Sequence, residues 1–135
     1  MTDIKALLEP IGLPASALEW LCDLWLVTQV LDDRADGDKT DAAENAAAAI
    51  FVRMPMNPFY DANRMALIPV LAVQLAKWRA ANAAENAGLA DEKSFMWRAG
   101  YYDVVAAACI LCGIDGEVGL HAYGEPFADY KKEFA

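Results

Sequence analysis

Apolar residues recur along most of the chain three and four positions apart, which is the spacing of an α-helix. Leu18, Leu21 and Trp25 form one such stripe, and a second apolar stripe lies beside it. Because apolar residues cover most of the circumference of this segment, we expect it to be a central helix. No stretch shows an alternation of apolar and polar positions strong enough to favour a strand. The pattern predicts an all-α protein.

Capping residues and glycines indicate where the helices begin and end. The predicted helices cover residues 2–8, 15–31, 41–53, 58–86 and 91–113. Asn57 and Asp91 are expected to cap the N-termini of the last two helices, and Gly113 is expected to end the final one. Pro69 lies inside the helix 58–86, which it is expected to kink or to split, because proline lacks a backbone N–H.

The length of 135 residues suits one ordinary domain. We therefore predict a single-domain bundle of four to five helices, with its core at residues 14–113. Residues 114–135 contain several glycines and are expected to form a C-terminal tail that wraps the bundle. A short helix is expected near Ala128, at the end of this tail.

Charge narrows the classes of partner. The chain carries 20 acidic and 11 basic residues, for a net charge of −9. Such a surface repels phosphate backbones and anionic lipids, so we expect neither nucleic-acid binding nor membrane binding. The first residues form no signal peptide, and no segment reaches the roughly 18 apolar residues of a membrane helix. We expect a cytoplasmic protein.

The three cysteines include one Cys-x-x-Cys pair, Cys109 and Cys112. A redox pair of this kind normally opens a helix, where the helix dipole lowers the thiol pKa. This pair instead closes an apolar run. Two small core residues in a reducing compartment are therefore the favoured interpretation over a redox or zinc site.

The acidic stretch from residue 31 to residue 41 is the first candidate for chemistry. Asp32, Asp33 and Asp36 spell Asp-Asp-x-x-Asp, and on a continuing helix Asp32 and Asp36 share one face. Two carboxylates so placed can bind Mg²⁺ or Mn²⁺, which then bridges to a phosphate group. The motif resembles the aspartate-rich motif of isoprenyl diphosphate synthases and terpene cyclases, and this resemblance implies binding of a magnesium–diphosphate group.

Two other interpretations of this stretch remain open. With Gly37 at the sixth position, it can be aligned with a calcium-binding loop, but Arg34 and Ala43 then stand where acidic ligands are needed. Alternatively, the aspartates, the glycine and Thr40 form a simple connection that turns the chain and caps the next helix.

Asp103 is the second candidate, because it lies close to a very apolar run. It is expected either to pair with Arg98, Arg64 or Lys77, or to join Glu19 and Asp23 in a cluster of acids. Such a cluster resembles the metal site of helical nucleotide pyrophosphatases. Gly100, however, stands where their glutamate would be.

These observations lead to two hypotheses about the function. The first is a non-enzymatic helical protein that acts through protein–protein contact or self-association, as a homo-oligomer or with a protein partner. The second is an enzyme that uses Mg²⁺ or Mn²⁺ to act on a phosphate- or diphosphate-bearing substrate. In it, Asp32, Asp33, Asp36, Asp103 and Asp23 are the candidate metal ligands, and Arg34, Arg98 and Arg64 are the candidate phosphate-binding residues.

Two segments resemble a known group of proteins. They are the stretch from Asn57 to Asn63, with the later run from Trp78 to Asn82, and the stretch from Arg98 to Asp103. They are similar to parts of an uncharacterised family of small all-α proteins of proteobacteria and their prophages. The resemblance implies a helical fold and an association with prophages, and it implies no particular activity.

Overall fold

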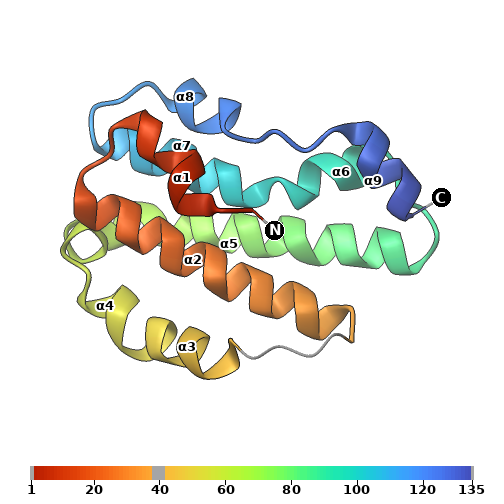
Figure 1. Ribbon diagram of the computed structural model, residues 1–135, viewed down its shortest axis with the longest axis horizontal. Coiled ribbons are helices and arrows are strands. Elements are labelled where there is room, and N and C mark those ends of the chain that lie inside the picture. The colour runs from red at the N-terminus through yellow and green to blue at the C-terminus, as the bar shows by residue number, and fades with distance from the viewer. Residues whose placement is uncertain (1, 38–41, 135) are drawn as a thin grey trace. The chain divides into compact units, whose positions relative to one another are not determined.

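The computed structural model describes residues 2–37 and 42–134, and every regular element within those ranges is a helix (Figure 1). In chain order these are α1 Ile4–Leu8, η1 Glu9–Ile11, α2 Ala15–Ala35, α3 Ala43–Ala48, η2 Ala49–Arg53, α4 Met54–Met56, α5 Pro58–Asn86, α6 Glu92–Arg98, α7 Gly100–Leu111, α8 Gly116–His121 and α9 Phe127–Glu133. The all-α class is confirmed. The prediction of four to five helices is wrong, because the region after residue 90 is divided more finely than the pattern indicated.

Contacts between residues group the chain into two compact units, Met1–Arg64 and Met65–Ala135. No helix among the described residues is both long enough and apolar enough to span a lipid bilayer.

The first unit is built around α2. Asp3 caps α1, since its carboxylate accepts a hydrogen bond from the Ala6 amide at 3.1 Å. Trp20, in α2, is fully buried and stacks on the ring of Tyr60 with 5.6 Å between ring centroids. The expectation that α2 is a central helix holds within this unit.

Residues 43–56 form one run of helix that contains a widened turn. The turn is the π-helix η2, in which the Met54 amide donates to the Ala49 carbonyl five residues earlier. Pro55 follows directly. A proline ring clashes with the carbonyl four residues before it, and a wider turn relieves this clash. The predicted helix therefore continues past Arg53 to Met56, while its expected start at Asp41 lies outside the described residues.

This run of helix ends at Asn57, which has an extended backbone. Its side-chain oxygen accepts a hydrogen bond from the Tyr60 amide at 3.1 Å, so Asn57 caps α5 as predicted. Its side-chain nitrogen donates to the Ser16 carbonyl at 2.9 Å, which ties the start of α5 to α2. Pro69 lies within α5 without splitting it.

In the second unit, the predicted helix 91–113 is two helices that meet at Ala99. Asp91 caps α6 in a reciprocal capping box with Ser94, as its sequence position indicated. Gly113 has φ +78°, in the left-handed region that glycine adopts without strain, and it ends α7 as predicted.

The glycine-rich tail is more ordered than expected. Its first part forms α8, which packs against α7. Gly119 lies so close to α7 that a Cβ atom there would come within 2.8 Å of the Ala106 backbone nitrogen, so only glycine allows this approach. The short helix expected near Ala128 is α9, which packs against α6.

Candidate functional site

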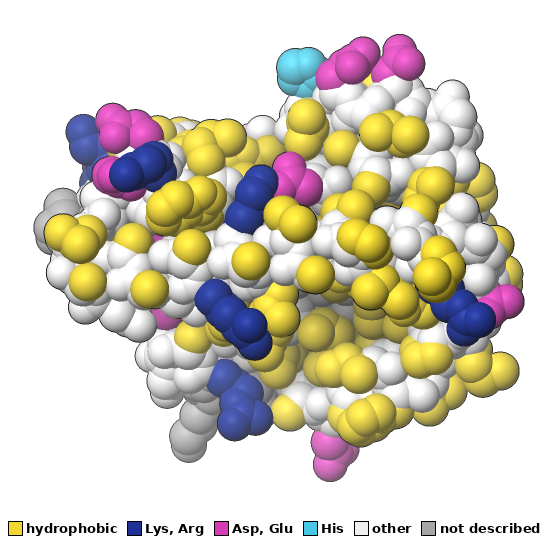
Figure 2. All heavy atoms as spheres, turned by 180° about the vertical axis from the view of Figure 1, so that it is seen from behind, with side chains coloured by type: hydrophobic (Ala, Val, Ile, Leu, Met, Phe, Trp, Pro, Cys, Tyr) yellow, Lys and Arg dark blue, Asp and Glu magenta, His cyan; other side chains and the backbone are white. Residues whose placement is uncertain are grey.

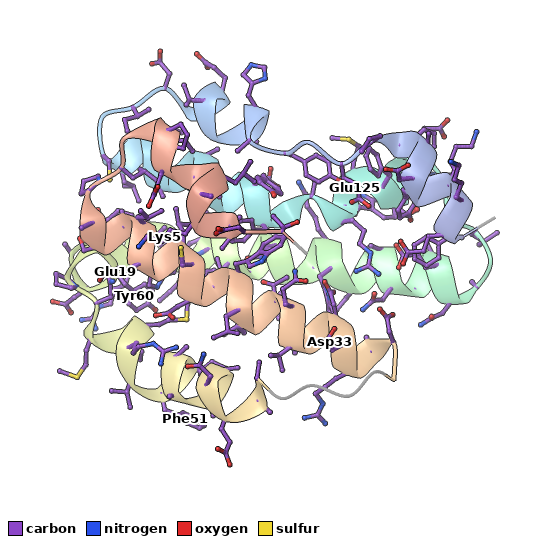
Figure 3. The ribbon with its side chains drawn as sticks, viewed as in Figure 1. Lys5, Glu19, Asp33, Phe51, Tyr60 and Glu125 are labelled. Atoms are coloured by element: carbon purple, nitrogen blue, oxygen red, sulfur yellow. The ribbon has the colours of Figure 1, made fainter. Side chains whose placement is uncertain are left out.

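The acidic stretch lies at the C-terminal end of α2. Asp32 and Asp33 belong to its last turn and Asp36 is its C-cap, and Figure 3 shows Asp33 at this end of the helix. Carboxylates at a helix C-terminus face the negative end of the helix dipole, which disfavours them slightly. Arg34 and Asp36 are exposed, while Asp32 and Asp33 are partly buried. Asp38 and Asp41 lie outside the described residues.

Asp23 belongs to an ion pair that the sequence did not indicate. Nε of Arg53 donates to its two carboxylate oxygens at 3.2 and 3.3 Å, and Nη2 of Arg53 donates to Oδ1 at 3.0 Å. The same guanidinium reaches the Asn45 carbonyl at 3.3 Å. Asp23 thus holds the π-helical turn against α2, so its carboxylate already has a cationic partner within the first unit.

Asp103 forms an ion pair with Lys77, which links α7 to α5. Lys77 is one of the three ion-pair partners that the sequence analysis expected for Asp103. Gly100 lies at the same crossing, where a Cβ atom would contact Gln74 Cγ at 3.4 Å. Asp103 belongs to the second unit and Asp23 to the first.

Arg98 pairs with Glu85, whose side chain is only 4 % exposed. The guanidinium donates to the two carboxylate oxygens of Glu85 at 2.8 and 2.6 Å. The Tyr130 hydroxyl donates to the same carboxylate at 2.9 Å, and it lies 2.5 Å from the hydroxyl of buried Ser94. We call Glu85, Arg98, Tyr130 and Ser94 the buried polar cluster. Within this cluster the Glu85 carboxylate neutralises the Arg98 guanidinium, and the contacts link α5, α6 and α9.

These placements bear on the proposed metal and phosphate site. Within the described ranges, no group of three or more His, Cys, Asp or Glu side chains is arranged to hold a metal ion. Asp23, Asp103 and Arg98 are each held by an ion pair. Arg64 is exposed on α5.

The cysteines fit the interpretation as small packing residues. Cys109 is buried in α7, and Cys112 is the C-cap of that helix. Desolvation by burial raises the pKa of both thiols, which is opposite to the shift that a reactive thiolate needs.

The most unusual surface is the outward side of α5. Between Met65 and Ala76, every exposed residue of this helix is apolar, and the only polar residue, Gln74, is buried. The exposed residues of this span are Met65, Ala66, Ile68, Pro69, Ala72, Val73, Leu75 and Ala76. We call these eight residues the α5 face. Figure 2 shows one face of the molecule, on which hydrophobic side chains are abundant between scattered charged ones.

A second apolar surface lies on the segment 49–56 of the first unit. Ala49 is the buried residue of this segment, while Phe51 is 78 % exposed. Figure 3 shows Phe51 on the outer side of the segment. Ile50, Val52 and Met56 are exposed as well. This surface is shorter than the α5 face and includes an irregular turn.

Comparison of the chain with models of protein families, with curated proteins and with solved structures finds no significant match. The resemblance to small helical proteins of proteobacteria and their prophages therefore stays a prediction.

Proposed function

We propose that the protein is a non-enzymatic helical protein that acts by self-association, and that two copies meet at the α5 face. The observation that carries this proposal is the run of exposed apolar side chains from Met65 to Ala76. Each apolar group removed from water contributes about 25 cal/mol per Å². A helix that exposes only apolar groups over three turns therefore gains free energy when another surface covers it.

Charge favours a second copy as the occupant. The chain has a net charge of −9, so two copies repel each other over most of their surfaces. Residues 62–84 contain no acidic residue, although the chain has 20 in total. Two copies that meet along α5 therefore bring together the stretch where this repulsion is weakest. An interface between identical apolar surfaces also needs no complementary site elsewhere on the molecule.

The metal-dependent enzyme has less support. It needs carboxylates and guanidinium groups that are available to a metal and a phosphate. Asp23, Asp103 and Arg98 are instead neutralised by Arg53, Lys77 and Glu85. A non-enzymatic role requires no such site.

Sedimentation velocity over a series from low micromolar to millimolar protein tests this proposal. The wild type is expected to shift from the mass of one 14.7 kDa chain towards twice that mass. Ile68→Glu is expected to remain monomeric, because each dimer would bury two uncompensated carboxylates. A wild type that stays monomeric throughout the series would overturn the proposal.

A matched variant controls for the added charge. Ile68 and Leu120 are both 48 % exposed, and Leu120 lies on α8, away from the α5 face in the sequence. Leu120→Glu is expected to associate as the wild type does. If both variants weaken association equally, net charge rather than the α5 face controls it, and the proposal fails.

A further inference from the structure

The α5 face belongs to a longer stripe with a heptad spacing. Positions that alternate three and four residues apart along α5 are all exposed, and they are Asp61, Met65, Ile68, Ala72, Leu75 and Arg79. On the opposite side of the helix, Leu67, Gln74 and Ala81 recur every seven residues and are all buried. One heptad-spaced side of α5 is thus buried within its own chain, and another is exposed. A second, exposed heptad-spaced side is typical of a helix that pairs with another helix.

The order of charges along this stripe is self-complementary. Asp61 stands at the N-terminal end, Arg79 stands at the C-terminal end, and the four residues between them are apolar. The two ends of the stripe are 18 positions apart, or about 27 Å at 1.5 Å per residue. If a copy of the stripe is reversed and laid on the original, each end meets the opposite charge.

We propose that two copies pair α5 against α5 in antiparallel orientation, about a two-fold axis near Val70. This inference rests on the proposed self-association and specifies its geometry. In this register, Met65 lies opposite Leu75 of the second copy, and Ile68 lies opposite its Ala72. Asp61 lies opposite Arg79 of the second copy, and the two-fold symmetry forms this pair twice.

The same charges disfavour the parallel arrangement. Parallel helices in register would place Asp61 against Asp61 and Arg79 against Arg79, so like charges would meet at both ends. The antiparallel arrangement replaces both repulsions with attractions. Ala72, which lies next to the proposed axis, is small enough to let the two helices approach closely.

The size of the surface sets the expected strength. One helix pair lies at the small end of specific protein interfaces, which bury about 800 Å² on each partner. We therefore expect a reversible dimer whose dissociation constant is on the order of micromolar.

Charge reversal tests the orientation and the register. Asp61→Arg is expected to raise the dissociation constant about tenfold at low salt, because it turns two attractive end pairs into two repulsive ones. Arg79→Asp is expected to have a similar effect. The double variant Asp61→Arg/Arg79→Asp is expected to associate as the wild type does, because it exchanges the charges and keeps the pairs.

Mixing the two single variants gives an independent test. One variant carries arginine at both ends of the stripe and the other carries aspartate at both ends. Neither associates well alone, and the mixture is expected to form heterodimers with an affinity near that of the wild type. In a parallel dimer, neither single variant would weaken association by new end pairs, because like charges already meet there.

The outcomes separate this inference from the proposed function. A dimer that Ile68→Glu dissociates, but that shows no rescue in the double variant or in the mixture, overturns the antiparallel register and leaves self-association intact. A wild type without any dimer overturns both. Asp61 and Arg79 are exposed, and thermal unfolding of each variant checks that the reversal has not unfolded the chain.

Discussion

Two regions of α5 depart from the usual distribution of polar and apolar groups, and they do so in opposite ways. At the C-terminal end of the helix, Glu85 is a charged side chain that is almost fully buried. In the middle, the α5 face consists of apolar side chains that are exposed. The first anomaly is resolved within the chain, because Arg98 and Tyr130 satisfy the Glu85 carboxylate.

The second anomaly has no such resolution among the described residues of its own unit. A buried charge with all its partners in place indicates a structural role, because a new ligand would have to displace those partners. An exposed apolar surface indicates association, because covering it gains free energy. We therefore expect the C-terminal end of α5 to contribute to stability and its middle to take part in the proposed self-association.

Removal of the buried carboxylate is expected to have the largest effect. Glu85→Ala leaves the Arg98 guanidinium, which is 18 % exposed, without its partner in a largely buried site. The free energy of unfolding is expected to fall by about 3 kcal/mol. Urea denaturation followed by circular dichroism measures this loss, with Glu92→Ala, which removes an exposed acid from α6, as the control. A loss no larger than that of the control would mean that the buried polar cluster is not a stabilising element.

Truncation within the α5 face is expected to act on association and to leave folding nearly unchanged. Ile68→Ala removes apolar surface twice in each dimer, so we expect it to weaken dimerisation by on the order of 2 kcal/mol. Sedimentation measures the association and urea denaturation measures the folding. Equal losses in both measurements would contradict the division of roles between the two regions.

A variant of Tyr130 tests how much the stability of the cluster depends on a neutral hydroxyl group. Tyr130→Phe removes the hydroxyl that donates to Glu85, and the free energy of unfolding is expected to fall by about 1 kcal/mol. Dimerisation is expected to be unchanged, because Tyr130 is buried in the C-terminal helix α9. Weaker dimerisation in this variant would show that the cluster and the α5 face are coupled.

Alkaline pH is expected to weaken the cluster before it affects association. Desolvation by burial raises the pKa of Tyr130 above its ordinary value of 10.0. The folded chain therefore binds this proton more tightly than the unfolded chain, so its contribution to stability is constant below about pH 10 and is lost as the pH rises further. Tyr102 and Tyr123, whose pKa values burial also raises, add to the same loss. Urea denaturation from neutral to alkaline pH is expected to show a shallower decline for Tyr130→Phe than for the wild type, and parallel declines would contradict this assignment.

The apolar surface of the first unit is expected to have the smallest effect. Phe51→Ser changes an exposed side chain on the segment 49–56, and we expect a change in unfolding free energy within about 0.5 kcal/mol. Dimerisation is expected to be unchanged, because this segment lacks the heptad stripe and its one cation, Arg53, is paired with Asp23. If Phe51→Ser dissociates the dimer, the interface lies on this segment and not on α5.

Local signals in the sequence predicted much of the helical structure. Asn57, Asp91 and Gly113 act where they were expected, because a cap or a left-handed glycine depends on the few residues beside it. Lys77, which forms an ion pair with Asp103, was among the partners expected for that residue. The division at Ala99, the wide turn before Pro55 and the helix α8 were missed, since apolar periodicity continues across the first two and glycines obscure the third.

The sequence by itself determined that the chain is helical, where several helices begin and end, and that apolar residues cover most of the circumference of α2. Only the tertiary structure decided which side of α5 is buried and which charges are neutralised. Asp23 and Arg53 are 30 residues apart, and Glu85 and Tyr130 are 45 residues apart. Such pairs form because helix packing brings distant turns together, and a buried carboxylate then requires a donor wherever the fold supplies one. Helical periodicity specifies the sides of each helix, whereas the choice between core and surface depends on which sides meet.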